Sequence, residues 1–206
     1  MRKYLSGLVV CIALLVVFSA CSSTITVAPG GATATSGQAT ATSSTGAPSG
    51  QEPNWGVQNK TTGCKAQGGL QDFACTPGDI IKSATKSQIC TPGYAGSVRN
   101  VPQSLKNKVY ASYGVKTRKP GQYEVDHLVS LQLGGSNNIA NLWPEINAPK
   151  PGFHEKDRVE NYLHDQLCKG KMTLKQVQIA IATNWLTVYK SMPNKSSGSS
   201  ANDDSE

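Results

Sequence analysis

The 206-residue sequence is poor in several residue types, and each shortage narrows the kinds of site that it can hold. It has no Cys-x-x-Cys pair, so a cysteine zinc knuckle is not expected. Residues 22–51 carry no charge and consist mostly of Ser, Thr, Ala and Gly, so they cannot bury enough apolar surface to fold. Histidine occurs only at His127, His154 and His164, and the first of these follows Asp126 directly.

The N-terminal residues have the features of an export signal. A basic start precedes a run of thirteen uncharged residues, Leu8–Ala20. A helix of that length spans about 20 Å, less than the roughly 30 Å hydrocarbon core of a bilayer, so the run suits a signal peptide better than a membrane span. Small residues before Cys21 resemble the bacterial lipoprotein cleavage box. We expect residues 1–20 to be a lipoprotein signal peptide and Cys21 to carry a lipid anchor on the extracytoplasmic face of the membrane. An ordinary secretory signal is the alternative.

The remaining chain divides into three parts. We expect residues 21–59 to be a disordered tether, residues 60–190 to fold as one domain and residues 191–206 to be a disordered tail. The expected domain has 17 Lys and Arg against 9 Asp and Glu, a net charge of +8, whereas the whole chain has +7. A basic domain favours anionic partners such as nucleic acid, anionic lipid or wall polymers, and solubility alone is the plain alternative.

The expected domain contains four cysteines: Cys64, Cys75, Cys90 and Cys168. An even number of cysteines in an exported domain indicates two disulfides, with three possible connectivities. We favour Cys64–Cys75 and Cys90–Cys168, because the second bond would tie the N-terminal segment to the C-terminal helices.

The pattern of apolar residues predicts a mixed α+β domain. Residues 60–100, with their Pro-Gly turns, are expected to be irregular, and residues 100–114 form a helix. Residues 122–133 are expected to form one or two short strands. Residues 154–168 and 173–190 are amphipathic helices, the second capped by Thr173.

Several short motifs of this region resemble the HNH nuclease family. They are Glu124-Val-Asp126-His127-Leu-Val, Leu133-Gly134-Gly135, Asn141-Leu142 and the helical His154-Glu-Lys-Asp157. The family's ββα-metal motif consists of two strands and a helix around one cation. The longer span from Ile89 to "IATNWLTVY" is similar to a group of exported bacterial HNH-type proteins. The resemblance implies a small ββα-metal core with additional helices, beside a disulfide-pinned irregular N-terminal segment.

The resemblance also implies a role for individual residues. His127 would be the general base that activates water against a phosphodiester, and Asn141 would orient His127 and fix the loop. Asp126 would bind a divalent metal, in the first place Mg²⁺, with Zn²⁺ and Mn²⁺ as alternatives. A bound cation neutralises charge that develops on the phosphate, and a neutral imidazole is the usual base.

The helical metal ligand is not fixed by the sequence. We prefer His154, with Asp157 as the alternative, although the spacing of both is also that of a solvated helix face. Lys156 and Glu160 are expected to be a surface ion pair. Glu124 shares a strand face with Asp126 and is left outside the expected site.

The function expected from these observations is metal-dependent phosphodiester hydrolysis of DNA or RNA by an exported endonuclease, with no obligate protein partner. The alternative is a non-catalytic module of the same shape that binds nucleic acid or wall polymer at the cell surface. Without the surrounding motifs, Asp126 and His127 would be read as an ordinary pair at the end of a strand.

Overall fold

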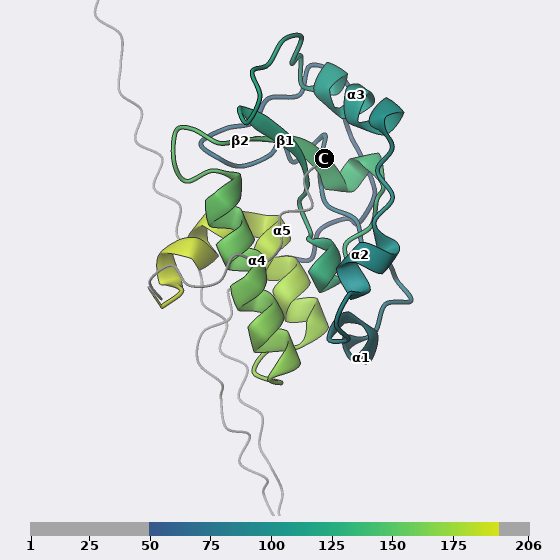
Figure 1. Cartoon of the computed structure of the whole chain (residues 1–206), viewed down its shortest axis with the longest axis vertical. Helices are drawn as coiled ribbons and strands as arrows, with labels where there is room; N and C mark the ends of the chain where they lie inside the picture. The colour runs from purple at the N-terminus through teal and green to yellow at the C-terminus, as the bar shows by residue number, and fades with distance from the viewer. Residues whose placement is uncertain (1–49, 194–206) are drawn as a thin grey trace, which may run out of the picture. The chain divides into compact units, whose positions relative to one another are not determined.

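A computed structural model describes residues 50–193, and these form a mixed domain of helices and one small antiparallel sheet (Figure 1). The α+β prediction is therefore confirmed at this level. The elements in chain order are α1 (Lys86–Ile89), α2 (Tyr94–Val98), α3 (Gln103–Ser112), β1 (Tyr123–His127), η1 (Leu131–Leu133), η2 (Ile139–Asn141), β2 (Leu142–Ile146), α4 (Phe153–Cys168) and α5 (Leu174–Ser191).

The sheet is a pair of five-residue strands. β1 and β2 run antiparallel, with Tyr123 opposite Ile146 and His127 opposite Leu142. Only the first strand was expected from the residues: β2 lies outside 122–133, in the segment that contains Pro144. Proline lacks the N–H that a ladder needs, which argues against a strand in sequence reading. In a two-stranded sheet β2 has a free edge, and Pro144 is tolerated there opposite Val125.

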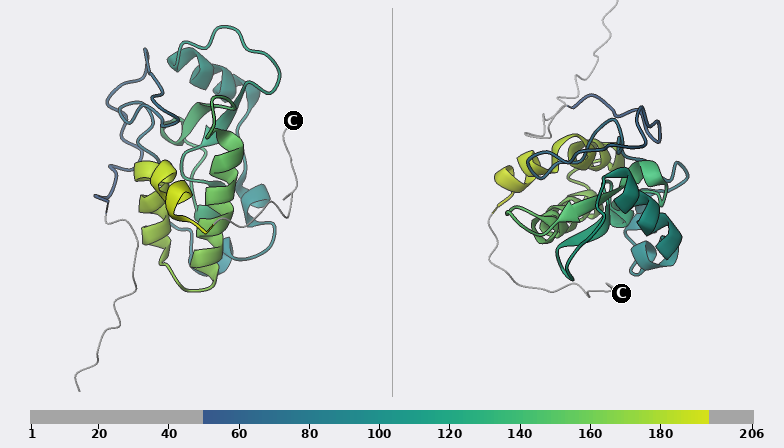
Figure 2. Two further views of the ribbon diagram at one scale, coloured as in Figure 1. Left: turned by 90° about the vertical axis from the view of Figure 1, so that its left-hand side faces the viewer. Right: turned by 90° about the horizontal axis from the view of Figure 1, so that it is seen from above.

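The two long helices agree with the sequence pattern. α4 and α5 pack against each other (Figure 2), and Val159, Leu163 and Leu167 of α4 are buried in a core shared with Val177 and Ile181 of α5. Trp143 of β2 and Trp185 of α5 are 1% and 0% exposed and belong to the same core. The Thr173 hydroxyl accepts a hydrogen bond from the backbone N–H of Gln176, so the expected N-cap of α5 is confirmed.

The segment before α3 is mostly irregular, as expected, and both favoured disulfides are present. Cys64 is bonded to Cys75 and Cys90 to Cys168. The expected boundary at residue 60 is wrong, because the preceding residues already pack on the domain. Trp55 packs against the core, and Gly56 N–H donates to the Gly78 carbonyl.

The irregular segment is also bonded to α5. Asn184 has non-helical backbone angles inside α5 (φ −167°, ψ 83°) and marks a kink. Near it, the Gln71 side chain donates to the Ala182 carbonyl at 3.2 Å, and the Trp185 indole donates to the Gly69 carbonyl at 3.1 Å. Near the kink, the Ala182 carbonyl of α5 is free to accept a bond from the N-terminal segment, and the Trp185 indole donates to that segment. These two bonds hold the N-terminal segment against α5.

The signal peptide at 1–20, Cys21, most of the tether and all but the first three residues of the predicted tail lie outside the described residues. Among residues 50–193, no helix combines the length and the apolar content that crossing a bilayer requires.

Candidate functional site

The loop between β1 and β2 is organised around the buried side chain of Asn141. Its amide donates to the carbonyls of Val129 and Ser136 at 2.9 and 2.8 Å, and its oxygen accepts from the Val129 N–H at 2.9 Å. A side chain at Gly135 would place its Cβ 1.7 Å from the Val129 oxygen, so only glycine fits this close turn. Asn141 therefore fixes the loop, as predicted.

His127 lies at the end of β1, and its partner is Asn137 rather than Asn141. The His127 Nε2 is 3.1 Å from the Asn137 oxygen. Asn137 donates its own amide to the Val98 carbonyl at 2.7 Å, and its oxygen also accepts from the Asn100 N–H. The prediction that Asn141 orients His127 is thus wrong, because the Asn141 side chain is fully used by the loop.

These bonds assign the proton of the His127 imidazole. The Asn137 oxygen is an acceptor toward Asn100, so Nε2 of a neutral His127 must donate to it. The other nitrogen, Nδ1, has no hydrogen bond among the described residues and keeps its lone pair. The ring is 4% exposed, and burial lowers the pKa of His127 to about 4. At neutral pH the imidazole is therefore an uncharged base.

Arg99, together with Lys156, contributes positive charge near this ring. Arg99 is exposed and lies between Val98 and Asn100, whose backbone groups hold Asn137. Its guanidinium helps to lower the pKa of His127, after the larger effect of burial. The imidazole of His127 and the guanidinium of Arg99 are thus close enough to interact electrostatically.

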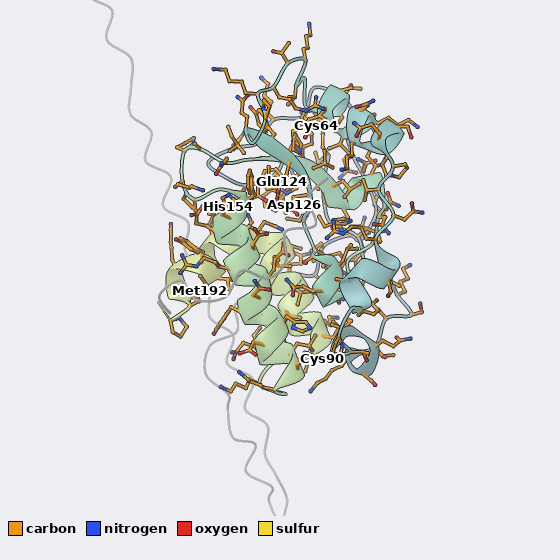
Figure 3. All side chains as sticks on the ribbon, viewed as in Figure 1. Cys64, Cys90, Glu124, Asp126, His154 and Met192 are labelled. Carbon is orange, nitrogen blue, oxygen red and sulfur yellow. A yellow bond between two sulfur atoms is a disulfide. The ribbon has the colours of Figure 1, made fainter. Side chains whose placement is uncertain are left out.

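The opposite face of the strand pair carries three carboxyl groups. Glu124 and Asp126 alternate with His127 along β1, so they point to the other side of the sheet. Glu145 of β2 lies opposite Glu124 in the register and shares this face. Figure 3 shows Glu124 and Asp126 between the strands and the N-terminal end of α4.

The first turn of α4 places an ammonium group among these carboxyls. Lys156 is 0% exposed, and its Nζ is 2.5 Å from Asp126 Oδ2, 2.5 Å from Glu160 Oε1 and 2.8 Å from the His127 carbonyl oxygen. All three ammonium protons therefore have partners. The expected surface pair of Lys156 and Glu160 is wrong: the two residues are buried, and Lys156 joins α4 to β1.

The charges of this cluster shift one another's titration. Burial acts to raise the pKa of Asp126, but Lys156 outweighs it, and the pKa lies below the ordinary value. Burial acts to lower the pKa of Lys156, but Asp126 and Glu160 hold it well above the ordinary value. Both partners therefore stay charged at neutral pH.

The other two carboxyls behave differently. Burial, with the nearby charge of Asp126, raises the pKa of Glu124 to about 8. Burial raises the pKa of Glu145 well above its ordinary value, and neither of its oxygens has a hydrogen bond of ordinary geometry. Burial thus favours the uncharged form of both Glu124 and Glu145 within the cluster formed by Glu124, Asp126, Glu145, Lys156 and Glu160. We refer to these five residues as the Lys156 cluster.

The predicted helical metal ligands do not join Asp126. His154 and Asp157 have 64% and 53% exposed side chains, and their nearest polar atoms are 3.9 Å apart. The Asp126 oxygen that faces α4 is bonded to Lys156. The residues Asp126, His154 and Asp157 thus do not fit the predicted divalent cation, because a cationic side chain already holds the carboxylate and the other two lie at the surface.

A different group of possible metal ligands lies at the other end of α4. Within residues 50–193, the only closely spaced set of three or more His, Cys, Asp or Glu ligand atoms belongs to Cys90, His164 and Cys168. The two cysteines are disulfide bonded, so their sulfurs are not thiolates. His164 Nε2 is 3.3 Å from the Ile89 carbonyl, which is consistent with a structural role in this oxidised form.

Sequence reasoning located part of this site and missed the rest. Asp126 and His127 were found through their motif, and Glu124 and Glu145 were not included. The alternation of β1 already places Glu124 beside Asp126, so that signal was present. Glu145 required knowledge of β2, and Asn137 required the fold. Comparison with protein-family models, curated proteins and solved structures gives no match to this chain.

Proposed function

We propose that the domain cleaves phosphodiester bonds of nucleic acid, with His127 as the general base, on an HNH-like arrangement of β1, β2 and α4. The single observation that carries the proposal is the state of the His127 ring. A neutral imidazole has its proton fixed on Nε2 by Asn137 and its lone pair on Nδ1. A buried histidine with one nitrogen oriented and the other unbonded is the arrangement that proton abstraction needs.

In the proposed reaction Nδ1 of His127 takes a proton from an attacking water. The water oxygen forms a bond to phosphorus as the bond from phosphorus to the leaving sugar oxygen breaks, and that oxygen takes a proton from solvent. The Arg99 guanidinium is the cationic group placed to offset charge on the phosphate. No step in this scheme uses His154 or Asp157.

The surface supports a polyanionic substrate. The segment before β1 lines a shallow hollow that includes Lys116, Arg118 and Lys119. Together with the net charge of +8 over residues 60–190, it offers contacts to phosphates that do not depend on base sequence.

We also propose that the protein is exported and held on the membrane through a lipid at Cys21. The two disulfides support the export alone, because disulfides persist mainly in oxidising compartments.

The test is cleavage of plasmid DNA and of a single-stranded RNA by the purified protein and by His127→Ala. We expect the variant to lose at least about 100-fold in rate, in line with the usual contribution of a general base. The rate of the native protein should fall on the acid side near pH 4, where His127 gains a proton, and not near pH 6.5. Equal rates for the two proteins would exclude His127 as the base.

A non-catalytic binding module is the second candidate, favoured by the small exposure of His127 (4%). Binding of nucleic acid with unchanged affinity in His127→Ala, and no cleavage by the native protein, would establish it. His164→Ala is the matched control, because this histidine bonds the Ile89 carbonyl far along α4 from the proposed site.

A further inference from the structure

The ammonium group of Lys156 lies where polar groups of β1 and α4 converge. It contacts the carboxyl groups of Asp126 of β1 and Glu160 of α4. It also bonds the backbone oxygen of His127 at 2.8 Å, so the cation is linked to the residue that carries the proposed base. These three bonds use every proton of the ammonium.

Burial and ion pairing indicate that this cation is resident. Lys156 has no solvent exposure, and removal of one partner from a buried pair is costly because the remaining charge is left uncompensated. A divalent ion at Asp126 Oδ2 would have to displace the ammonium, which would then need another partner for its charge. The ammonium is already bonded to one carboxylate oxygen of β1 and one of α4, so a metal ion placed there would have to break both ion pairs.

We infer that Lys156 takes the place of a divalent metal in this domain, so that the site holds no metal between β1 and α4 and works without one. The inference deepens the proposed function and rests on it for the cleavage measurements. Lys156 is a positioning residue here, because its protons are used inside the protein and none points to a substrate. Its positive charge keeps Asp126 ionised, and its bond to the His127 carbonyl holds the end of β1 against α4.

The chain supplies no other fixed ligand set for a metal at this position. A carboxylate-rich site for Mg²⁺ or Mn²⁺ requires several oxygens that converge on one point. Among residues 50–193, the acidic and histidine side chains around β1 and α4 do not bring three such atoms close together. The ammonium is the group on which the carboxylate oxygens converge.

The first experiment measures binding of Mn²⁺ to the metal-stripped protein, by the loss of the free-ion signal in electron paramagnetic resonance. We expect the native protein and Asp126→Asn to give the same curve. Binding of one equivalent by the native protein that is lost in Asp126→Asn would overturn the inference. This measurement needs neither cleavage activity nor a change at Lys156.

The second experiment creates the site that Lys156 blocks. In Lys156→Ala the carboxylates of Asp126 and Glu160 face an empty volume, and we expect the variant to bind one Mn²⁺ that the double variant Lys156→Ala, Asp126→Asn does not bind. The matched control is Lys169→Ala, which removes an exposed lysine that pairs with Asp165 at the same i,i+4 spacing on α4. A folded Lys156→Ala with no more affinity than the control would count against the ammonium as an ion substitute.

The third experiment compares cleavage by the native protein in EDTA and in Mg²⁺. Rates within two-fold support the inference, and a drop of ten-fold or more in EDTA overturns it. If no cleavage occurs in either condition, the proposed function fails, whereas the Mn²⁺ measurements still decide whether Lys156 stands in for a metal.

Discussion

The two ends of α4 are joined to the rest of the domain by different chemistry. At the N-terminal end, Lys156 connects the helix to β1 through buried charges. At the C-terminal end, Cys168 is covalently bonded to Cys90, which Figure 3 labels, and His164 bonds the Ile89 carbonyl. The first connection depends on protonation and the second on oxidation. One helix is therefore held at two points that respond to different conditions, and each can be removed without touching the other.

The largest effect is expected at the ionic end. Lys156→Met leaves Asp126 and Glu160 without their buried cation, and loss of one partner of such a group costs about 3–5 kcal/mol in the free energy of unfolding. The loss should be smaller at pH 5 than at pH 8, because the uncompensated carboxyls can take up protons. Urea denaturation at the two pH values measures both quantities.

The control for this change is Lys169→Met on the same helix. Lys169 pairs with Asp165 at the surface, where both side chains are about half exposed, and the expected loss is below about 0.5 kcal/mol. If the two variants were equally stable, the N-terminal end of α4 would not be held by Lys156.

The covalent end gives an effect of similar size. Replacing both Cys90 and Cys168 by serine opens a loop with a sequence separation of 78, worth about 4.5 kcal/mol in the loop-entropy model. The same replacement at Cys64 and Cys75, with a separation of 11, is expected to cost about 3 kcal/mol. Thermal denaturation of both variants tests which replacement costs more stability. A larger loss for the Cys64 and Cys75 replacement would show that the long loop between Cys90 and Cys168 keeps its structure without the bond.

A smaller and pH-dependent effect is expected for Glu124→Gln. The pKa of Glu124 is about 8 in the folded protein against 4.5 for the free group. Between these values the folded protein holds a proton that the unfolded chain has lost, so the stability from this group is complete below pH 4.5 and declines as the pH rises through 8. Glutamine does not ionise. The free energy of unfolding of the variant should therefore rise relative to that of the native protein from pH 5 to pH 9. Parallel curves of unfolding free energy against pH would contradict the raised pKa of Glu124.

The smallest effect is expected at the exposed surface beside the ionic end. His154→Ala removes a side chain that is 64% exposed, lies 3.9 Å from Asp157 and packs edge-on against the Phe153 ring. We expect a change below two-fold in cleavage rate and below about 0.5 kcal/mol in stability. A ten-fold loss of cleavage would return His154 to the site and would weaken the distinction between the buried and exposed faces of α4.

Much of the fold followed from local patterns. The helices α4 and α5 could be predicted because apolar residues recur at helical spacing, and Thr173 marks a start. The disulfides followed from an even number of cysteines and a preference among pairings. β2 was missed because its central proline argues against a strand, and the boundary near residue 60 was wrong because Trp55 supplies apolar surface within a polar stretch.

The site was harder to predict, because its contacts join distant parts of the chain. Asp126 and His127 are adjacent, and their motif was enough to find them. The partners that decide their chemistry lie elsewhere: Asn137 reaches His127 across ten residues, and Lys156 reaches Asp126 across thirty. A lysine four residues before a glutamate on a helix has the pattern of a surface pair. Only the packing of α4 on the sheet shows that Lys156 is buried.

The way Asn137 is held also determines which positions near the histidine can vary. The Asn137 side chain is hydrogen bonded to a main-chain carbonyl and a main-chain N–H of the 98–100 segment, and not to the side chains of that segment. Val98 and Asn100 could therefore be exchanged for many other residues in related sequences with no effect on the ring. Position 137 has no such freedom, since an aspartate there would lose the donor to Val98 and a leucine would lose all three bonds, to Val98, Asn100 and His127. Variation across these three positions in related chains should accordingly be very uneven.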